Sequence, residues 1–175
     1  MPSNHTKLDQ ATNDTRSTFS LLTASHEIVS LPREDQTATL ELDVMRQDEL
    51  SAHFACYLCI IVFGFVERST KQLVGDYIQT HTQKAPQVYR FVQNQLNGLW
   101  GINYEKFKTL ITTLDPEWWT ELKIKKDREL QSLAGLSALR NKLAHGEDIT
   151  TTVGQIDQYF EDVSNLLIAL SELLV

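Results

Sequence analysis

The chain contains the octapeptide Leu139-Arg140-Asn141-Lys142-Leu143-Ala144-His145-Gly146, which has the pattern of an amphipathic helix that ends at a glycine. Asn141 and His145 are four residues apart, so they share one face of that helix. Arg140 keeps the register of the apolar stripe formed by Leu133, Leu136 and Leu143. A guanidinium group cannot lose its charge and is costly to bury alone. We therefore expect Arg140 to meet a carboxylate, a partner subunit or a bound anion.

Length and composition place this helix in a single globular domain. The chain has 175 residues, of which 42% are hydrophobic and 22% charged, and these shares are ordinary for a globular protein. Its 7 glycines and 4 prolines argue against a turn-rich all-β fold. The net charge of −7 means that the whole molecule does not attract nucleic acid. A nucleic-acid site would have to be a local basic patch or be built by oligomerisation.

The two cysteines and the longest apolar run bear on compartment. Cys56 and Cys59 have the spacing of a redox pair or of half a metal site, but no second Cys/His pair lies at zinc-ligand spacing. We interpret them as core residues, and we expect no metal and a reducing, cytoplasmic compartment. The run from Phe54 to Val66 is shorter than the roughly 20 residues that cross a bilayer, so it predicts a buried helix and no membrane partner. The first residues lack the pattern of a signal peptide.

Hydrophobic periodicity predicts an all-α antiparallel bundle with a long central helix and extra short helices. The long helix should run from about Arg46 to Thr82, and Gly64 inside it suggests close helix packing or a kink. Short helices should follow Pro86, and Thr152 with Gln155 should cap the last helix. The alternation of Leu40, Leu42 and Val44 indicates a short strand, although a helix start from Glu34 fits equally well. We expect residues 1–40 to form a polar, helical and partly flexible arm and residues 41–175 to form the domain.

The motif Arg140-Asn141 followed by His145 resembles that of the HEPN superfamily, in particular the branch named for fusions to RiboL-PSP domains. Four residues separate the arginine from the histidine, and the motif ends the penultimate predicted helix. We expect the resemblance to cover about residues 45–175. Motifs of serine hydrolases, P-loop proteins, dinucleotide-binding proteins and zinc proteases are absent from the sequence.

The resemblance implies a homodimeric, metal-independent ribonuclease without a cofactor, of the toxin or phage-defence kind, with RNA as substrate. His145 would act as general base or general acid, and Arg140 would hold the phosphate and stabilise the charge of the transition state. Asn141 would orient His145 or donate to a phosphate oxygen. The product would carry a 2′,3′-cyclic phosphate, and an antitoxin or defence-system protein would be a further partner.

Other interpretations of the same residues stay open. His145 can simply cap its helix, and Arg140 can form an internal salt bridge. Glu67 can pair with Arg140 or Arg68, either structurally or in support of the site. A basic set can line the approach of RNA or form a solvated helix face; its members are Lys123, Lys125, Lys126, Arg128 and Lys142. The alternative function is a non-catalytic HEPN-like binding or regulatory module that acts with a partner protein, and a third is a helical scaffold unrelated to RNA.

Overall fold

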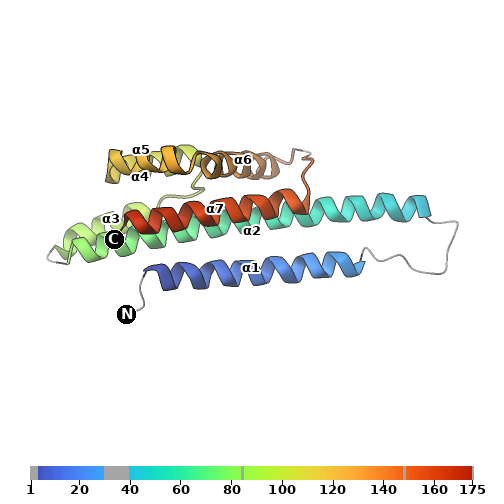
Figure 1. Ribbon diagram of the computed structural model, residues 1–175, viewed down its shortest axis with the longest axis horizontal. Coiled ribbons are helices and arrows are strands. Elements are labelled where there is room, and N and C mark those ends of the chain that lie inside the picture. The colour runs from blue at the N-terminus through green and yellow to red at the C-terminus, as the bar shows by residue number, and fades with distance from the viewer. Residues whose placement is uncertain (1–3, 30–39, 84, 148, 175) are drawn as a thin grey trace.

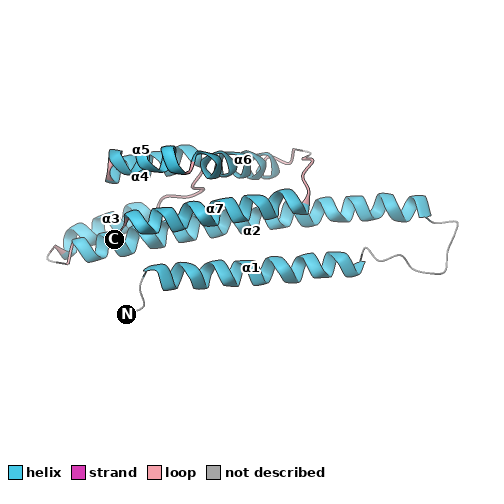
Figure 2. Cartoon of the chain, in the orientation of Figure 1, coloured by secondary structure: helices cyan, strands magenta, loops and turns pink. Residues whose placement is uncertain are grey.

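The computed structural model describes residues 4–29, 40–83, 85–147 and 149–174, and the regular secondary structure of these residues is entirely helical (Figure 2). The all-α prediction is therefore confirmed. The helices in chain order are α1 (Asn4–Val29), α2 (Leu40–His81), α3 (Pro86–Asn97), α4 (Tyr104–Leu114), α5 (Pro116–Lys125), α6 (Asp127–Ala144) and α7 (Val153–Leu173).

The bundle is built around α2, which contacts α1, α3, α6 and α7 (Figure 1). In Figure 1, α2 and α7 run in the same direction, and α1 and α6 run in the opposite direction. The rings of Phe65 on α2 and Phe160 on α7 meet edge to face with centroids 5.5 Å apart, and both side chains are buried. Apolar residues recur on several faces of α2, so neighbouring helices can pack around it.

Local stop and start signals set the helix ends as predicted. Pro86 occupies the first turn of α3, and the carboxylate of Asp115 caps α5. The hydroxyl of Thr152 accepts from the backbone N–H of Gln155 at 3.2 Å, which confirms the cap of α7. The capping box is only half formed, because the side-chain oxygen of Gln155 accepts from the hydroxyl of Thr151 at 3.0 Å.

The strand expected at Leu40, Leu42 and Val44 is wrong, because α2 begins at Leu40. Leu40 and Val44 are four residues apart, a spacing that also suits one face of a helix. The alternative helix start at Glu34 lies outside the described residues. The long helix thus begins six residues before the predicted start at Arg46.

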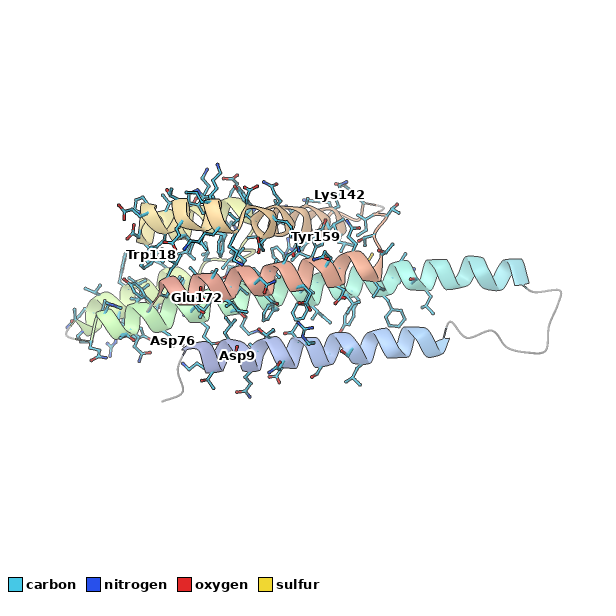
Figure 3. All side chains as sticks on the ribbon, in the orientation of Figure 1. Asp9, Asp76, Trp118, Lys142, Tyr159 and Glu172 are labelled. Atoms are coloured by element: carbon cyan, nitrogen blue, oxygen red, sulfur yellow. The ribbon has the colours of Figure 1, made fainter. Side chains whose placement is uncertain are left out.

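The N-terminal segment forms α1, which packs against α2 and α7. Leu8 is buried, the Nζ of Lys7 lies 2.8 Å from a carboxylate oxygen of Asp76 on α2, and Arg16 pairs with Glu161 on α7 at 2.6 Å. Figure 3 labels Asp9, near the start of α1, and Asp76, near the end of α2, at the same end of the bundle. Asn4–Val29 of the predicted arm is thus helical; the division into an arm and a domain at residues 40 and 41 stays a prediction.

One stretch of α2, Leu50–His81, is long and apolar enough to cross a membrane when judged by length and composition alone. It extends beyond the shorter run from Phe54 to Val66 on which the sequence argument rested. In this bundle it contributes the buried residues Leu58, Val62 and Val66 to the core that α2 shares with its neighbours. The core helix of a soluble protein meets the same criteria, so the stretch is weak support for a membrane span.

A buried carboxylate joins α6 to α7. Asp162 on α7 is 3% exposed at its side chain, and it accepts hydrogen bonds from Arg128 and from Ser132 (2.7 Å) on α6 and from Gln158 (3.1 Å). Burial alone would raise the pKa of Asp162, but the hydrogen bonds from these three side chains and the charge of Arg128 outweigh it and lower the pKa below its ordinary value.

Replacing this carboxylate should weaken the bundle in a pH-dependent way. We expect Asp162→Asn to lower the free energy of unfolding by about 1 to 3 kcal/mol at pH 7, because Arg128 and Ser132 lose a charged acceptor. A group whose pKa is lowered by folding stabilises the protein above its unfolded value, near 4, and this contribution is lost as the pH falls through the folded value.

Urea unfolding of the wild type and of Asp162→Asn at pH 7, 4 and 3 measures the effect. The difference between the two proteins should shrink at the lowest pH. Asp157→Asn, on an exposed face of the same helix, is the matched control and should change little. A difference that stays constant down to pH 3 would contradict the ionised role of Asp162.

Candidate functional site

Arg140 lies on the side of α6 that faces α2, and its guanidinium carbon is 5.4 Å from the centroid of the Phe63 ring. The residue is half-buried and lines a cavity of about 410 Å³ whose other lining residues come from α2. Across the part of the chain that the structure describes, no carboxylate lies within ion-pair distance of Arg140. Among the described side chains, no ion pair supports the internal salt bridge considered for Arg140. A bound anion and a partner subunit remain as the groups that can meet its charge.

The end of α6 presents His145 to solvent. Gly146 has φ of +69°, in the left-handed region that favours glycine. The N–H of Gly146 donates to the carbonyl of Leu143 at 3.1 Å and the N–H of Glu147 to that of Lys142 at 3.0 Å, which together form a Schellman motif. The glycine stop is thus confirmed, and it holds His145 at the C-cap with an exposed side chain.

The three motif residues do not converge within one chain. Arg140 faces α2, whereas Asn141 and His145 are exposed. Five residues at about 100° each separate Arg140 from His145 by about 140° around the helix. The backbone N–H of His145 donates to the carbonyl of Asn141 at 3.1 Å, but among the described residues no side-chain hydrogen bond joins Arg140, Asn141 and His145 to one another. A site that uses Arg140 and His145 together therefore needs a second surface.

Glu67 pairs with neither arginine, so that prediction is wrong. One carboxylate oxygen accepts from Lys71 at 2.9 Å, and the other accepts from the backbone N–H of Gly101 at 2.7 Å. Burial raises the pKa of Glu67, but the hydrogen bonds from Lys71, Gly101 and Ile102 and the charge of Lys71 lower it overall. The ionised carboxylate is thus engaged by Lys71 and by the α3–α4 loop.

Gly64 mediates no close packing among the described residues, which corrects that part of the sequence interpretation; the alternative of a kink stays a prediction. A Cβ atom built on Gly64 would meet no atom within 4 Å, and Gly64 lines the same cavity as Arg140. Because Gly64 has no side chain, the solvent-facing surface of α2 stays open beside the guanidinium group of Arg140.

Cys59 behaves as a core residue, whereas Cys56 is half-buried. Cys59 is fully buried, and both thiols are free. Burial raises the pKa of the Cys59 thiol to about 11, and the neighbouring Cys56 adds to this while the charge of Arg140 opposes it. Such a thiol is not a nucleophile at neutral pH. Within the described residues, no group of three His, Cys, Asp or Glu side chains is placed to hold a metal ion.

The sequence matches the RiboL-PSP-HEPN family over residues 26–175. The chain belongs to the RiboL-PSP-HEPN family. The match covers the motif and begins inside α1, earlier than the expected residue 45. Membership associates this RiboL-PSP-HEPN chain with nuclease or RNA-related modules. No curated protein and no solved structure matches the chain.

The structure does not bring the predicted basic set of this HEPN chain to the motif. Lys125 pairs with Glu121 at 2.7 Å, Lys126 with Glu129 at 3.1 Å, and Arg128 with Asp162. These lysines and the exposed Lys123 lie around the start of α6, and its 18 residues span about 27 Å. Figure 3 shows Trp118 of α5 and Lys142 of α6 near opposite ends of this part of the bundle. Only the exposed Lys142 lies beside the motif.

Sequence reasoning gave no role in the site to Arg68, Lys71 or Trp100. Arg68 and Lys71 line the Arg140 cavity, and Trp100 in the α3–α4 loop is 71% exposed. The nitrogen Nζ of Lys71 lies 4.6 Å from the centroid of the Trp100 ring. The available signal was positional: Gly64, Arg68 and Lys71 follow helical spacing, and Trp100 stands next to Gly101.

Two glycine substitutions, one on α2 and one on α6, test the packing at these positions. We expect Gly64→Ala to raise the free energy of unfolding by up to about 1 kcal/mol, because alanine favours the helix and nothing obstructs its methyl group. Gly135→Ala in α6 is the matched comparison, since its Cβ would lie 2.7 Å from the hydroxyl oxygen and 3.0 Å from the ring carbon Cζ of Tyr159 on α7.

Chemical denaturation should therefore give opposite signs for the two variants, with Gly135→Ala less stable than the wild type. A loss of stability in Gly64→Ala would show that the glycine does make a close contact and would contradict the open surface at Arg140.

Proposed function

We propose that this protein is a metal-independent endoribonuclease whose active site is completed by a second copy of the chain. The observation that carries the proposal is Arg140, a half-buried guanidinium group beside a cavity with no carboxylate partner among the described residues. An uncompensated guanidinium group is suited to bind a phosphate. His145 follows five residues later on the same helix end, exposed and held at its C-cap.

The proposed reaction is a transfer within the RNA backbone. The 2′-hydroxyl oxygen attacks the adjacent phosphorus, and the bond from phosphorus to the 5′ oxygen breaks, leaving a 2′,3′-cyclic phosphate and a 5′-hydroxyl. His145 takes the proton from the 2′-hydroxyl or gives one to the leaving 5′ oxygen. Arg140 stabilises the negative charge on the phosphate oxygens. Asn141 orients the imidazole or donates to a phosphate oxygen, and no metal ion takes part in these steps.

A dimer accounts for the separation of Arg140 and His145 within one chain. A two-fold axis beside α6 brings Arg140 of one chain near His145 of the other. Tyr57 and Ile60, which lie on α2 near the cavity, are more than half exposed, and such apolar side chains suit a subunit interface. We further propose a toxin or phage-defence setting, with an antitoxin or defence-system protein as partner.

A second function is a non-catalytic HEPN module that binds a regulatory partner. The observation in its favour is that no described side chain donates to or accepts from Asn141 or His145. An imidazole that lacks such a hydrogen bond is not oriented for proton transfer in the single chain.

Cleavage in the presence of excess EDTA tests the enzymatic function. We expect the wild type to cut bulk RNA and leave 2′,3′-cyclic phosphate ends. Arg140→Ala should lower the rate by about 10²- to 10³-fold, and His145→Ala by about 10²- to 10⁴-fold. The control is His81→Ala, which removes an exposed histidine at the end of α2 and should leave cleavage unchanged.

Circular dichroism and thermal unfolding of each variant separate a catalytic effect from a folding effect. Cleavage that survives in Arg140→Ala and His145→Ala would refute the assignment of these residues. Absence of cleavage in the wild type, with a partner protein still bound equally by both variants, would favour the regulatory module.

A further inference from the structure

The cavity beside Arg140 continues along α2 toward α3. A second cavity, of about 330 Å³, is also lined by Arg68 and Lys71, so the two cavities meet at these residues. Beyond that point the lining includes the amide side chains of Gln72 on α2 and of Gln93 and Asn97 on α3. Amide groups both donate and accept hydrogen bonds, so this part of the groove can address the edges of bases.

The groove carries a surplus of positive charge in an acidic protein. Within the described part of the chain, neither Arg68 nor Arg140 has a carboxylate within ion-pair distance. The two carboxylates that line the cavities are already engaged, Glu67 by Lys71 and Asp76 by Lys7. Two guanidinium groups therefore remain uncompensated along one face of α2, while the whole chain has a net charge of −7.

Trp100 lies beside Lys71, which lines both cavities, with the Nζ of Lys71 4.6 Å from the centroid of its ring. The backbone on either side of the ring is fixed: the carbonyl of Trp100 accepts from Lys106, and the N–H of Gly101 donates to Glu67. Gly101 has φ of +59°, a conformation that favours glycine at this point of the loop. Exposing a large aromatic ring to water is unfavourable for a monomer, and here the loop holds the ring in that position.

We propose that this groove, with Arg68 and Lys71 in its lining and Trp100 beside Lys71, binds the single-stranded RNA that flanks the scissile phosphate. Arg68 and Lys71 hold a backbone phosphate next to the one at Arg140, and a base stacks on the solvent-facing side of the Trp100 ring. Single-stranded RNA is the ligand because a base inside a duplex has no free face to stack on an aromatic side chain. The inference rests on the proposed ribonuclease function and assigns that site its RNA-binding groove.

Binding in a cleavage-deficient background tests the groove. In the full chain carrying His145→Ala, fluorescence anisotropy with a labelled single-stranded RNA of mixed sequence gives the dissociation constant. Adding Trp100→Ala should weaken binding by about 5- to 100-fold, with partial recovery in Trp100→Phe. Adding Arg68→Ala should also weaken binding and lower the salt dependence by about one phosphate contact. An RNA duplex of the same sequence should bind more weakly and be insensitive to Trp100→Ala.

The matched control is Lys108→Ala, because the Nζ of Lys108 on α4 lies 6.0 Å from the centroid of the Trp119 ring on α5 in a similar lysine–tryptophan pair. Binding by Trp100→Ala and Arg68→Ala equal to that of Lys108→Ala, or no binding by the parent protein, would overturn the groove. Wild-type cleavage with a KM that Trp100→Ala and Arg68→Ala leave unchanged would overturn the groove and leave the ribonuclease standing. If both variants lose binding and the wild type shows no cleavage, the result would support the groove and refute the catalytic function.

Discussion

The contact between Arg140 and Phe63 is the constraint on which the site depends. α6 and α2 pack so that a permanently charged group lies over an aromatic ring at the edge of the core. A cation over a ring gains about 0.5 to 2 kcal/mol, which does not replace the hydration that a buried guanidinium group loses. The charge is tolerated because the cavity beside it is open to water and ions. The same opening makes Arg140 available to a phosphate.

The neighbouring residues keep the charge of Arg140 from being neutralised. Glu67, the carboxylate that lines the same cavity, binds Lys71 and the N–H of Gly101. Gly64 contributes no side chain to cover the guanidinium group, and Cys59 beneath it is a buried neutral thiol. One hydrogen-bonded carboxylate thus serves two purposes: it ties the α3–α4 loop to α2, and it leaves Arg140 free for another anion.

The parts of the fold that follow from short-range signals could be predicted from the sequence. Gly146 ends α6 and Thr152 begins α7 because each acts within a few residues of its own backbone. The apparent alternation at Leu40 to Val44 misled the prediction of α2, since a few apolar residues fit a strand and a helix face equally well. The expectation that Arg140 needs a partner stays a prediction, and its contact with Phe63 depends on how two distant helices pack. The partner of Glu67 and the position of Trp100 depend on the α3–α4 loop, which returns to α2 over more than 30 residues of sequence.

The measurement that tests the shared site most directly is complementation between two inactive chains. Arg140→Ala and His145→Ala, carrying different tags, are co-expressed, and the dimers that contain both chains are isolated by two affinity steps. A site built from Arg140 of one chain and His145 of the other leaves one of two sites intact in each mixed dimer, so these dimers should recover about half of the wild-type cleavage rate in EDTA. Mixed dimers as inactive as either variant alone, alongside an active wild type, would contradict the composite site.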